Sequence, residues 1–193
     1  MNYLAHIYLS GADKQLQIGG FIADFVKGSK AGKHPVGVWN GIVLHRKIDS
    51  FTDSHPIVRE LVDLLRPEFG RYSAIVLDMY FDHFLAADFK QITSKNLWWF
   101  SFSFSINVLW SYRYLPKGVK GFIFHFTATN RLYKYSKING LHESLEIMSV
   151  YKIKSLKPDA CIQFLNENKT IMEPRFRVFF AELQQYVQNE LIA

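Results

Sequence analysis

Apolar positions recur every three to four residues over much of the chain, which is the pattern of amphipathic helices. The segment 36–51 shows this period, and Pro35 suits the first turn of a helix there. A second helix is expected over 57–65, where Pro67 and Gly70 mark its end. The first third of the chain therefore predicts helices joined by short turns.

The next helix is expected over 74–89, with Ser73 as its cap. Segment 97–110 is ambiguous, because its alternating Phe and Ser residues favour a strand locally. Such a strand has no evident partner in the sequence. An aromatic-rich helix is therefore the interpretation adopted.

Helices are also expected over 120–134 and 141–151, separated by Asn139-Gly140. Pro158 and Pro174 are expected to open the last two helices. No internal repeat or linker divides the sequence. The prediction is an all-α fold, a helical bundle that spans residues 1–193 as one domain.

Composition agrees with a globular protein of one domain. The chain has 193 residues, of which 49% are apolar, 21% charged and 16% aromatic. Its net charge is +6, and a basic surface attracts acidic partners such as nucleic acid, an anionic membrane or an acidic protein. Charge alone does not choose among these three.

The sequence also excludes some classes. Cys161 is the only cysteine, so neither an intramolecular disulfide nor a cysteine-based metal site is expected. The N-terminus lacks the basic stretch and apolar run of a signal peptide. The most apolar segment, 97–110, is shorter than the ~20 residues that span a bilayer. A cytoplasmic protein without a membrane segment is expected.

Histidines and aspartates in apolar, helical contexts are the residues that carry chemistry. His45 and Asp49 are four residues apart, as are Asp78 and Asp82, so each pair projects from one helix face. His83 follows the second pair. Carboxylates are costly to bury unless they are paired or bind a cation. The two pairs therefore predict a divalent metal site between helices.

Ligands of this mixed type suit Mn²⁺, Fe²⁺, Mg²⁺ or Zn²⁺ rather than a metal that prefers thiolates. Such a site can polarise a phosphoryl oxygen and generate hydroxide from water near neutral pH. Arg46 is adjacent to His45 and could bind a phosphate through two parallel hydrogen bonds. Residues of this kind therefore suit chemistry on a phosphate group.

Structural interpretations compete with the catalytic one. A single buried histidine such as His6 is more often a hydrogen-bonded core residue than a ligand on sequence alone. Asp53 reads as a helix end or cap, and Asp49 suits local capping as well as metal binding. Asp78 and Asp82 lie among apolar residues, where a solvated charged face is hard to draw, so the functional interpretation is preferred there.

At this point the residues resemble a known family, the bacterial acyl carrier protein phosphodiesterases. The resemblance rests on the order and spacing of segments over the first ninety residues: Asn2-Tyr3-Leu4-Ala5-His6, Gly20-Phe21-Ile22-Ala23-Asp24-Phe25-Val26-Lys27-Gly28, Gly41-Ile42-Val43-Leu44-His45-Arg46-Lys47-Ile48-Asp49, Thr52-Asp53 and Leu77-Asp78 to Asp82-His83-Phe84-Leu85. The second half is similar more loosely, at 130–135 and from Gly140-Leu141 to Met148-Ser149. Val150-Tyr151-Lys152 departs from the family, which tends to carry an arginine there, and this departure bears on substrate preference.

The resemblance implies a helical fold distantly related to the HD phosphohydrolases. It implies Mn²⁺-dependent hydrolysis of the phosphodiester that joins 4′-phosphopantetheine to a serine of holo acyl carrier protein, an acidic protein, with Mg²⁺ or Fe²⁺ as alternative metals. Carried over by position, the expected metal-site residues are His6, Asp24, His45, Asp49, Asp78 and Asp82. Asp24, Arg46 and His83 are the expected catalytic residues, Arg46 as a phosphate clamp and His83 either as a partner of a metal-binding side chain or as the general acid.

Two other functions remain open on the sequence. The chain could be a metal phosphohydrolase that acts on a nucleotide or another small phosphodiester. It could also be a binding module without catalysis that docks acidic partners through its basic face. Neither nucleic acid nor a membrane is expected as the partner of the preferred function, and the sequence leaves the oligomeric state open.

Overall fold

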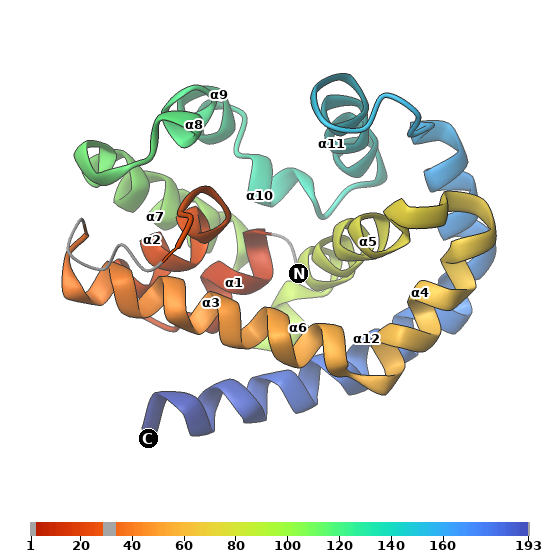
Figure 1. The fold of residues 1–193 in the computed structure, drawn as a ribbon, viewed down its shortest axis with the longest axis horizontal. Coiled ribbons are helices and arrows are strands. Elements are labelled where there is room, and N and C mark those ends of the chain that lie inside the picture. The colour runs from red at the N-terminus through yellow and green to blue at the C-terminus, as the bar shows by residue number, and fades with distance from the viewer. Residues whose placement is uncertain (1–2, 29–33, 193) are drawn as a thin grey trace.

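The computed structural model describes residues 3–28 and 34–192, and within these ranges every regular element is a helix. The all-α prediction is therefore confirmed for the described part of the chain. Figure 1 shows the helices in chain order. The α-helices are α1 (Tyr3–Leu9), α2 (Lys14–Ile22), α3 (Val36–Ser54), α4 (Pro56–Phe69), α5 (Ser73–Ala87), α6 (Phe89–Thr93), α7 (Leu97–Trp110), α8 (Lys117–Lys120), α9 (Ile123–Ala128), α10 (Arg131–Lys134), α11 (Ile138–Tyr151) and α12 (Pro158–Ile192). The described residues also include the short 3-10 turns η1 (Ala23–Phe25), η3 (Gly70–Tyr72) and η4 (Tyr112–Tyr114).

Helices α2 and α3 approach each other closely because glycines face each other across the contact. A Cβ atom on Gly19 would lie 2.1 Å from the Val38 carbonyl oxygen, and one on Gly41 would lie 2.3 Å from the Leu16 carbonyl oxygen. No side chain larger than hydrogen fits at either position. The two helix backbones therefore pack directly on each other, and α1 lies against α2 and α5.

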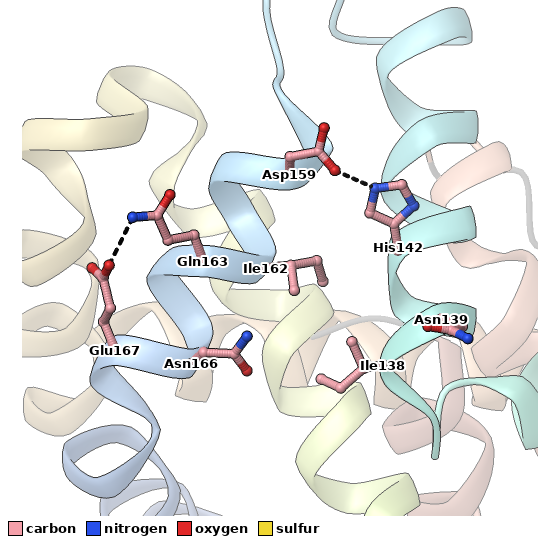
Figure 2. A pocket seen from close by; sticks show the side chains of 8 residues that line it. All are labelled: Ile138, Asn139, His142, Asp159, Ile162, Gln163, Asn166 and Glu167. Atoms are coloured by element: carbon pink, nitrogen blue, oxygen red, sulfur yellow. Dashed lines mark hydrogen bonds and ion pairs between the residues drawn. The ribbon is translucent and has the colours of Figure 1, made fainter.

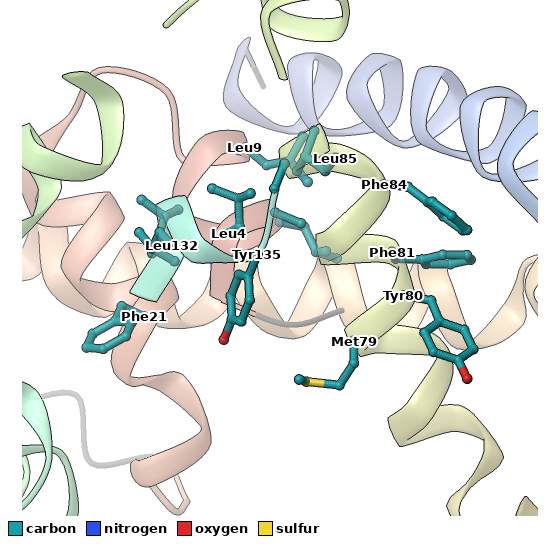
Figure 3. Packing of buried hydrophobic residues seen from close by; sticks show 14 of the residues in the cluster. Leu4, Leu9, Phe21, Met79, Tyr80, Phe81, Phe84, Leu85, Leu132 and Tyr135 are labelled. Atoms are coloured by element: carbon teal, nitrogen blue, oxygen red, sulfur yellow. The ribbon is translucent and has the colours of Figure 1, made fainter. Parts of the chain in front are cut away.

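The core forms one cluster of buried apolar side chains around α5 and α12. Figure 3 shows residues of α1, α2, α5 and α10 that pack in it. The rings of Phe81 and Phe84 on α5 lie 5.1 and 5.7 Å from the ring of Phe176 on α12. Helix α12, drawn in blue in Figure 1, also contacts α3 and α4. Aromatic packing thus joins the end of the chain to its first half.

Several predicted helix boundaries are wrong. Pro174 lies inside α12, which runs unbroken from Pro158 to Ile192, rather than opening a separate helix. Segment 120–134 holds the end of α8 and the short helices α9 and α10 instead of one long helix. Asn139-Gly140 belongs to α11 rather than to a break before it. At Pro174 and Asn139-Gly140 the helix continues in spite of the local preference of Pro and Gly, whereas within 120–134 α8 ends before Gly121 and the left-handed Asn130 precedes α10.

The start of α5 also differs from the expectation. Ser73 is the first residue of the helix, and its hydroxyl donates to the Gly70 carbonyl oxygen instead of capping the helix N-terminus. The helical interpretation of 97–110 is confirmed. Asn96 caps α7, because its side-chain oxygen accepts the Trp99 N–H at 3.1 Å.

Candidate metal centre

Four of the predicted site residues meet on one side of the molecule, from three different elements. His6 lies on α1, Asp24 on η1, and His45 and Asp49 on α3. The Nε2 atom of His45 lies 3.0 Å from Asp49 Oδ2 and 3.3 Å from Asp24 Oδ1. The Nε2 atom of His6 lies 3.2 Å from Asp49 Oδ1. Each oxygen of Asp49 therefore faces one imidazole.

The two imidazole rings stack on each other, with centroids 3.7 Å apart and planes inclined by 17°. One ligand atom from each of His6, His45 and Asp49 lies within 4.8 Å of the others. This is the spacing that allows three side chains to share one cation. Asp24 joins the group through His45.

The tautomer of His45 follows from the close packing of α2 and α3. Its Nδ1 atom lies 2.8 Å from the Gly20 carbonyl oxygen, which can only accept, so Nδ1 carries a proton and donates it. The Nε2 atom is then the one that faces the two carboxylates. An imidazole that donates through one nitrogen and offers the other to a metal is the usual arrangement of a histidine ligand.

The electrostatics of the cluster show what its centre attracts. Burial lowers the pKa of His45, but hydrogen bonds to Asp24 and Asp49 outweigh burial and raise it to about 9. The hydrogen bond to His45 lowers the pKa of Asp24, and the bonds to both histidines hold the pKa of Asp49 well below its usual range against the effect of burial. The carboxylates of Asp24 and Asp49 are thus both ionised, and a positive charge between them is favourable. A proton on His45 supplies that charge, and so would a divalent cation.

His6 behaves differently from His45. Burial lowers its pKa to about 4, in spite of its hydrogen bond to Asp49, so its imidazole is neutral near pH 7. A neutral imidazole is the form that binds metals. Two imidazole nitrogens with two carboxylates make a donor set that fits Mn²⁺, Fe²⁺ or Zn²⁺. The residues present therefore fit a divalent metal ion.

The cluster is closed towards the core and open towards solvent. The side chains of His6 and His45 are 1% and 5% exposed, whereas those of Asp49 and Asp24 are 38% and 63% exposed. A substrate can therefore approach from the carboxylate side. The protein interior holds the histidines in place.

The carboxyl group of Asp82 contacts the start of helix α1. Its two carboxylate oxygens accept the backbone N–H groups of Leu4 at 2.8 Å and Ala5 at 3.2 Å. Burial raises the pKa of Asp82 to about 7, although these two donors oppose the rise. The carboxylate anchors the first turn of α1 to α5 and so positions His6. Asp82 and its neighbour Asp78, whose pKa burial also raises, stay predictions as ligands.

Arg46 and His83 likewise make contacts that hold structure. The Arg46 guanidinium donates to the Val26 and Gly28 carbonyl oxygens at 3.2 and 3.1 Å, which ties the segment after Asp24 to α3. His83 is buried and donates from Nδ1 to the Tyr135 carbonyl oxygen at 2.7 Å. The roles of phosphate clamp and general acid stay predictions.

Sequence reasoning missed the part played by the glycines. Gly19 and Gly41 permit the helix contact that brings the Gly20 carbonyl oxygen to His45, and Gly20 itself faces α1, where an added Cβ atom would lie 3.3 Å from the His6 carbonyl oxygen. Three glycines at apolar helical positions were the available signal, since glycine in a helix interior is costly unless a backbone approaches it closely.

A hollow of about 500 Å³ lies between α11 and α12, away from these four side chains (Figure 2). None of its lining residues belongs to the histidine and aspartate cluster. Its polar side chains pair with each other: His142 Nε2 lies 2.9 Å from Asp159 Oδ1, and Gln163 donates to Glu167 at 2.8 Å. The histidine and aspartate cluster and this hollow are therefore separate sites.

Comparison with known proteins gives a consistent result. The family model described as acyl carrier protein phosphodiesterase matches residues 1–183. Proteins named acyl carrier protein phosphodiesterase are 38% identical over 92 residues in Yersinia pestis, 43% over 96 residues in Enterobacter sp. (strain 638) and 45% over 94 residues in Salmonella agona. These matches cover 48–49% of this chain, and the chain spans about half the length of the curated relatives it matches.

No solved structure matches the chain, so the expected relationship to the HD phosphohydrolases stays a prediction. In the described part of the chain, no helix has the combination of length and apolar character needed to cross a bilayer. The match over residues 1–183 covers nearly the whole sequence, including the histidine and aspartate cluster. The chain therefore belongs to the acyl carrier protein phosphodiesterase family.

Proposed function

We propose that this chain hydrolyses the phosphodiester between 4′-phosphopantetheine and a serine of holo acyl carrier protein, releasing apo carrier protein and free 4′-phosphopantetheine. The observation that carries the proposal is the convergence of His6, His45 and Asp49 in a protein of this family. The relatives' printed names support the same activity.

His6, His45 and Asp49 would hold a divalent cation, preferably Mn²⁺, and Asp24 would complete its surroundings. When bound there, the cation supplies Lewis acidity towards a phosphoryl oxygen and activates water. The Gly20 carbonyl oxygen fixes the tautomer of His45, and Asp82 fixes the helix that carries His6. Because Arg46 has further N–H groups beyond the two that bind Val26 and Gly28, it can also face a phosphate at the solvent side.

The surroundings of η1 support an acidic protein as the substrate. Gly118 of α8 packs against the Phe25 ring, at a distance where an added Cβ atom would lie 3.0 Å from the ring. Lys117 and Lys120 belong to the same short helix as Gly118, which packs on the turn that carries Asp24. Cations at this position would attract an acidic carrier protein while its prosthetic group reaches the cluster.

The test is hydrolysis of a purified holo carrier protein, followed by intact mass spectrometry. We expect the carrier to lose the mass of phosphopantetheine with Mn²⁺ present and to keep it with a chelator. Parallel reactions with Mg²⁺ and Fe²⁺ identify the preferred metal. Failure with every divalent metal would refute the proposal, and equal turnover of a small phosphodiester would favour a general phosphohydrolase instead.

A further inference from the structure

Helix α7 lies on the surface of the protein, and the face that it turns to solvent is apolar. Its 14 residues include no charged side chain. Leu97, Phe104 and Val108 are buried on the inner side. The outer side exposes a stripe that we call the α7 face, formed by Trp98, Trp99, Phe102, Ile106, Leu109 and Trp110. A surface helix normally carries polar residues on its outer side.

The α7 face is continuous and large. The Trp98 ring lies 4.7 Å from the Trp99 ring and stacks on the Phe102 ring at 5.1 Å. Trp99 is 63% and Trp110 85% exposed. An aromatic side chain can bury ~150–250 Å², so the exposed fractions of these six side chains together leave roughly 700 Å² open to solvent. The largest apolar patch on a typical monomer is ~300–600 Å². A surface of this size marks a binding site.

Charge around the face limits what can cover it. Between Phe89 and His142 the sequence has eight Lys and Arg residues and no Asp or Glu, and two of the eight, Arg131 and Lys134, form ion pairs with Glu143. Beyond the end of α7, Arg113 lies over the Tyr114 ring at 4.5 Å and Lys120 over the Tyr112 ring at 4.9 Å. Two copies of this face would bring like charges together, which is unfavourable. The partner must therefore be anionic as well as apolar.

A small polar hollow lies at the start of the stripe. It has a volume of about 430 Å³, and its lining includes Lys14, Lys95, Asn96, Trp99 and Asn107. The Asn107 side chain donates to the Lys14 carbonyl oxygen at 2.9 Å and holds the two walls together. Two ammonium groups beside side-chain amides suit one phosphate group.

We propose that the α7 face docks this protein on an anionic phospholipid bilayer, as a peripheral contact that does not span it. Trp98, Trp99 and Trp110 would lie at the headgroup level, where Trp is favoured. Lys14 and Lys95 would bind the phosphate of one lipid, and the acyl region would cover Phe102 and Ile106. Surrounding cations strengthen the attraction to an anionic leaflet.

The experiment is flotation of the full chain with vesicles of phosphatidylcholine alone or with phosphatidylglycerol added. We expect binding to the anionic vesicles at least about tenfold tighter than to neutral ones, and a blue shift of tryptophan emission. Replacing Trp99→Ser with Trp110→Ser, or Lys14→Gln with Lys95→Gln, should each weaken binding about tenfold. Both tryptophans are exposed, so circular dichroism should not change.

Two controls separate this contact from general stickiness. Tyr151→Ser removes an aromatic side chain that is 81% exposed elsewhere, and Lys152→Gln with Lys154→Gln removes two exposed cations. Both should leave vesicle binding unchanged, as should a chelator. Absence of binding, or equal loss in the controls, would overturn the proposal. Sedimentation velocity that shows a dimer dependent on Trp99 and Trp110 would overturn it in favour of a second copy.

Discussion

Both oxygens of Asp49 face an imidazole of the candidate centre, so this side chain links His6 to His45. We expect Asp49→Asn to reduce hydrolysis of holo carrier protein by at least about 100-fold and Mn²⁺ affinity by at least about tenfold. Asp53→Asn is the matched control, because Asp53 is exposed on the same helix one turn later. Steady-state rates and Mn²⁺ titration check both. Similar losses of activity and Mn²⁺ affinity in the two variants would show that Asp49 is not a metal ligand.

Asp82 offers a separate test, because it holds α1 through two backbone N–H groups. Removing the acceptor in Asp82→Ala leaves these buried donors without it, which should lower the free energy of unfolding by roughly 1–3 kcal/mol. Asp63→Ala, at an exposed position on α4, should change it by less than about 0.5 kcal/mol. Urea denaturation measures both. Unchanged stability with lost Mn²⁺ affinity would make Asp82 a ligand instead.

His83 should make stability depend on pH. Burial lowers its pKa in the folded protein, and the charge of Lys169 adds to this. The unfolded chain, with a pKa of about 6.5, then binds the proton more readily, so stability is complete above about pH 6.5 and falls as pH drops through the lower folded pKa. His83→Asn keeps a donor for the Tyr135 carbonyl oxygen but does not titrate. The stability difference between wild type and variant should change below pH 6.5, and a constant difference would contradict this.

Local spacing predicted part of the centre but not all of it. His45 and Asp49 share a helix face, so their proximity follows from sequence alone. Asp82 has the same kind of spacing with Asp78, yet its carboxylate is turned to α1, which is far away in the sequence. Nothing local shows whether a buried carboxylate meets a cation or a helix end.

At the scale of elements, the glycine contact between α2 and α3 sets the geometry of the centre. We expect Gly41→Ala to push the helices apart, since its Cβ would lie 2.3 Å from the Leu16 carbonyl oxygen. The variant should lose roughly 1–3 kcal/mol of stability and bind Mn²⁺ more weakly. Gly121→Ala is the control, because its Cβ would meet only ordinary contacts, at 3.5 Å or more. Thermal unfolding and Mn²⁺ titration would show no difference between the two if the close contact did not matter.

Element types were predicted better than element ends. The apolar period identified α3, α4 and α5 as helices, and the lack of a partner strand favoured a helix for α7. Pro174 suggested a boundary that α12 does not have, because packing of Phe176 and Phe179 in the core holds the helix together on the far side of the proline. A proline does not end a helix where buried aromatic contacts stabilise the helix on both sides of it.

At the scale of the whole molecule, charge is divided unevenly. The segment from Phe89 to His142 is entirely basic in its charged residues. We expect Lys117→Gln with Lys120→Gln to raise the apparent KM for holo carrier protein several-fold with little effect on kcat, because these cations speed encounter rather than chemistry. Measuring KM from low to high salt checks this. A flat salt dependence in the wild type would contradict it.

Lys152→Gln with Lys154→Gln is the matched control for that prediction, since it removes the same charge from the segment before α12. Its KM should stay close to that of the wild type at every ionic strength. Composition predicted an acidic partner, but only the packing of α8 on η1 showed that Lys117 and Lys120 lie on a helix next to the turn that carries Asp24. The distribution of charge in space depends on tertiary contacts that composition does not contain.

The hydrogen bonds from Leu4 and Ala5 to Asp82 also determine when the centre can form during synthesis. A helix of seven residues such as α1 is too short to persist by itself, and its anchor is made 77 and 78 residues later. At ~5–20 residues per second, a ribosome needs roughly 4–15 s to add that stretch, and longer to release it from the exit tunnel. His6 is thus translated well before α5, yet it reaches its place only after α5 has emerged.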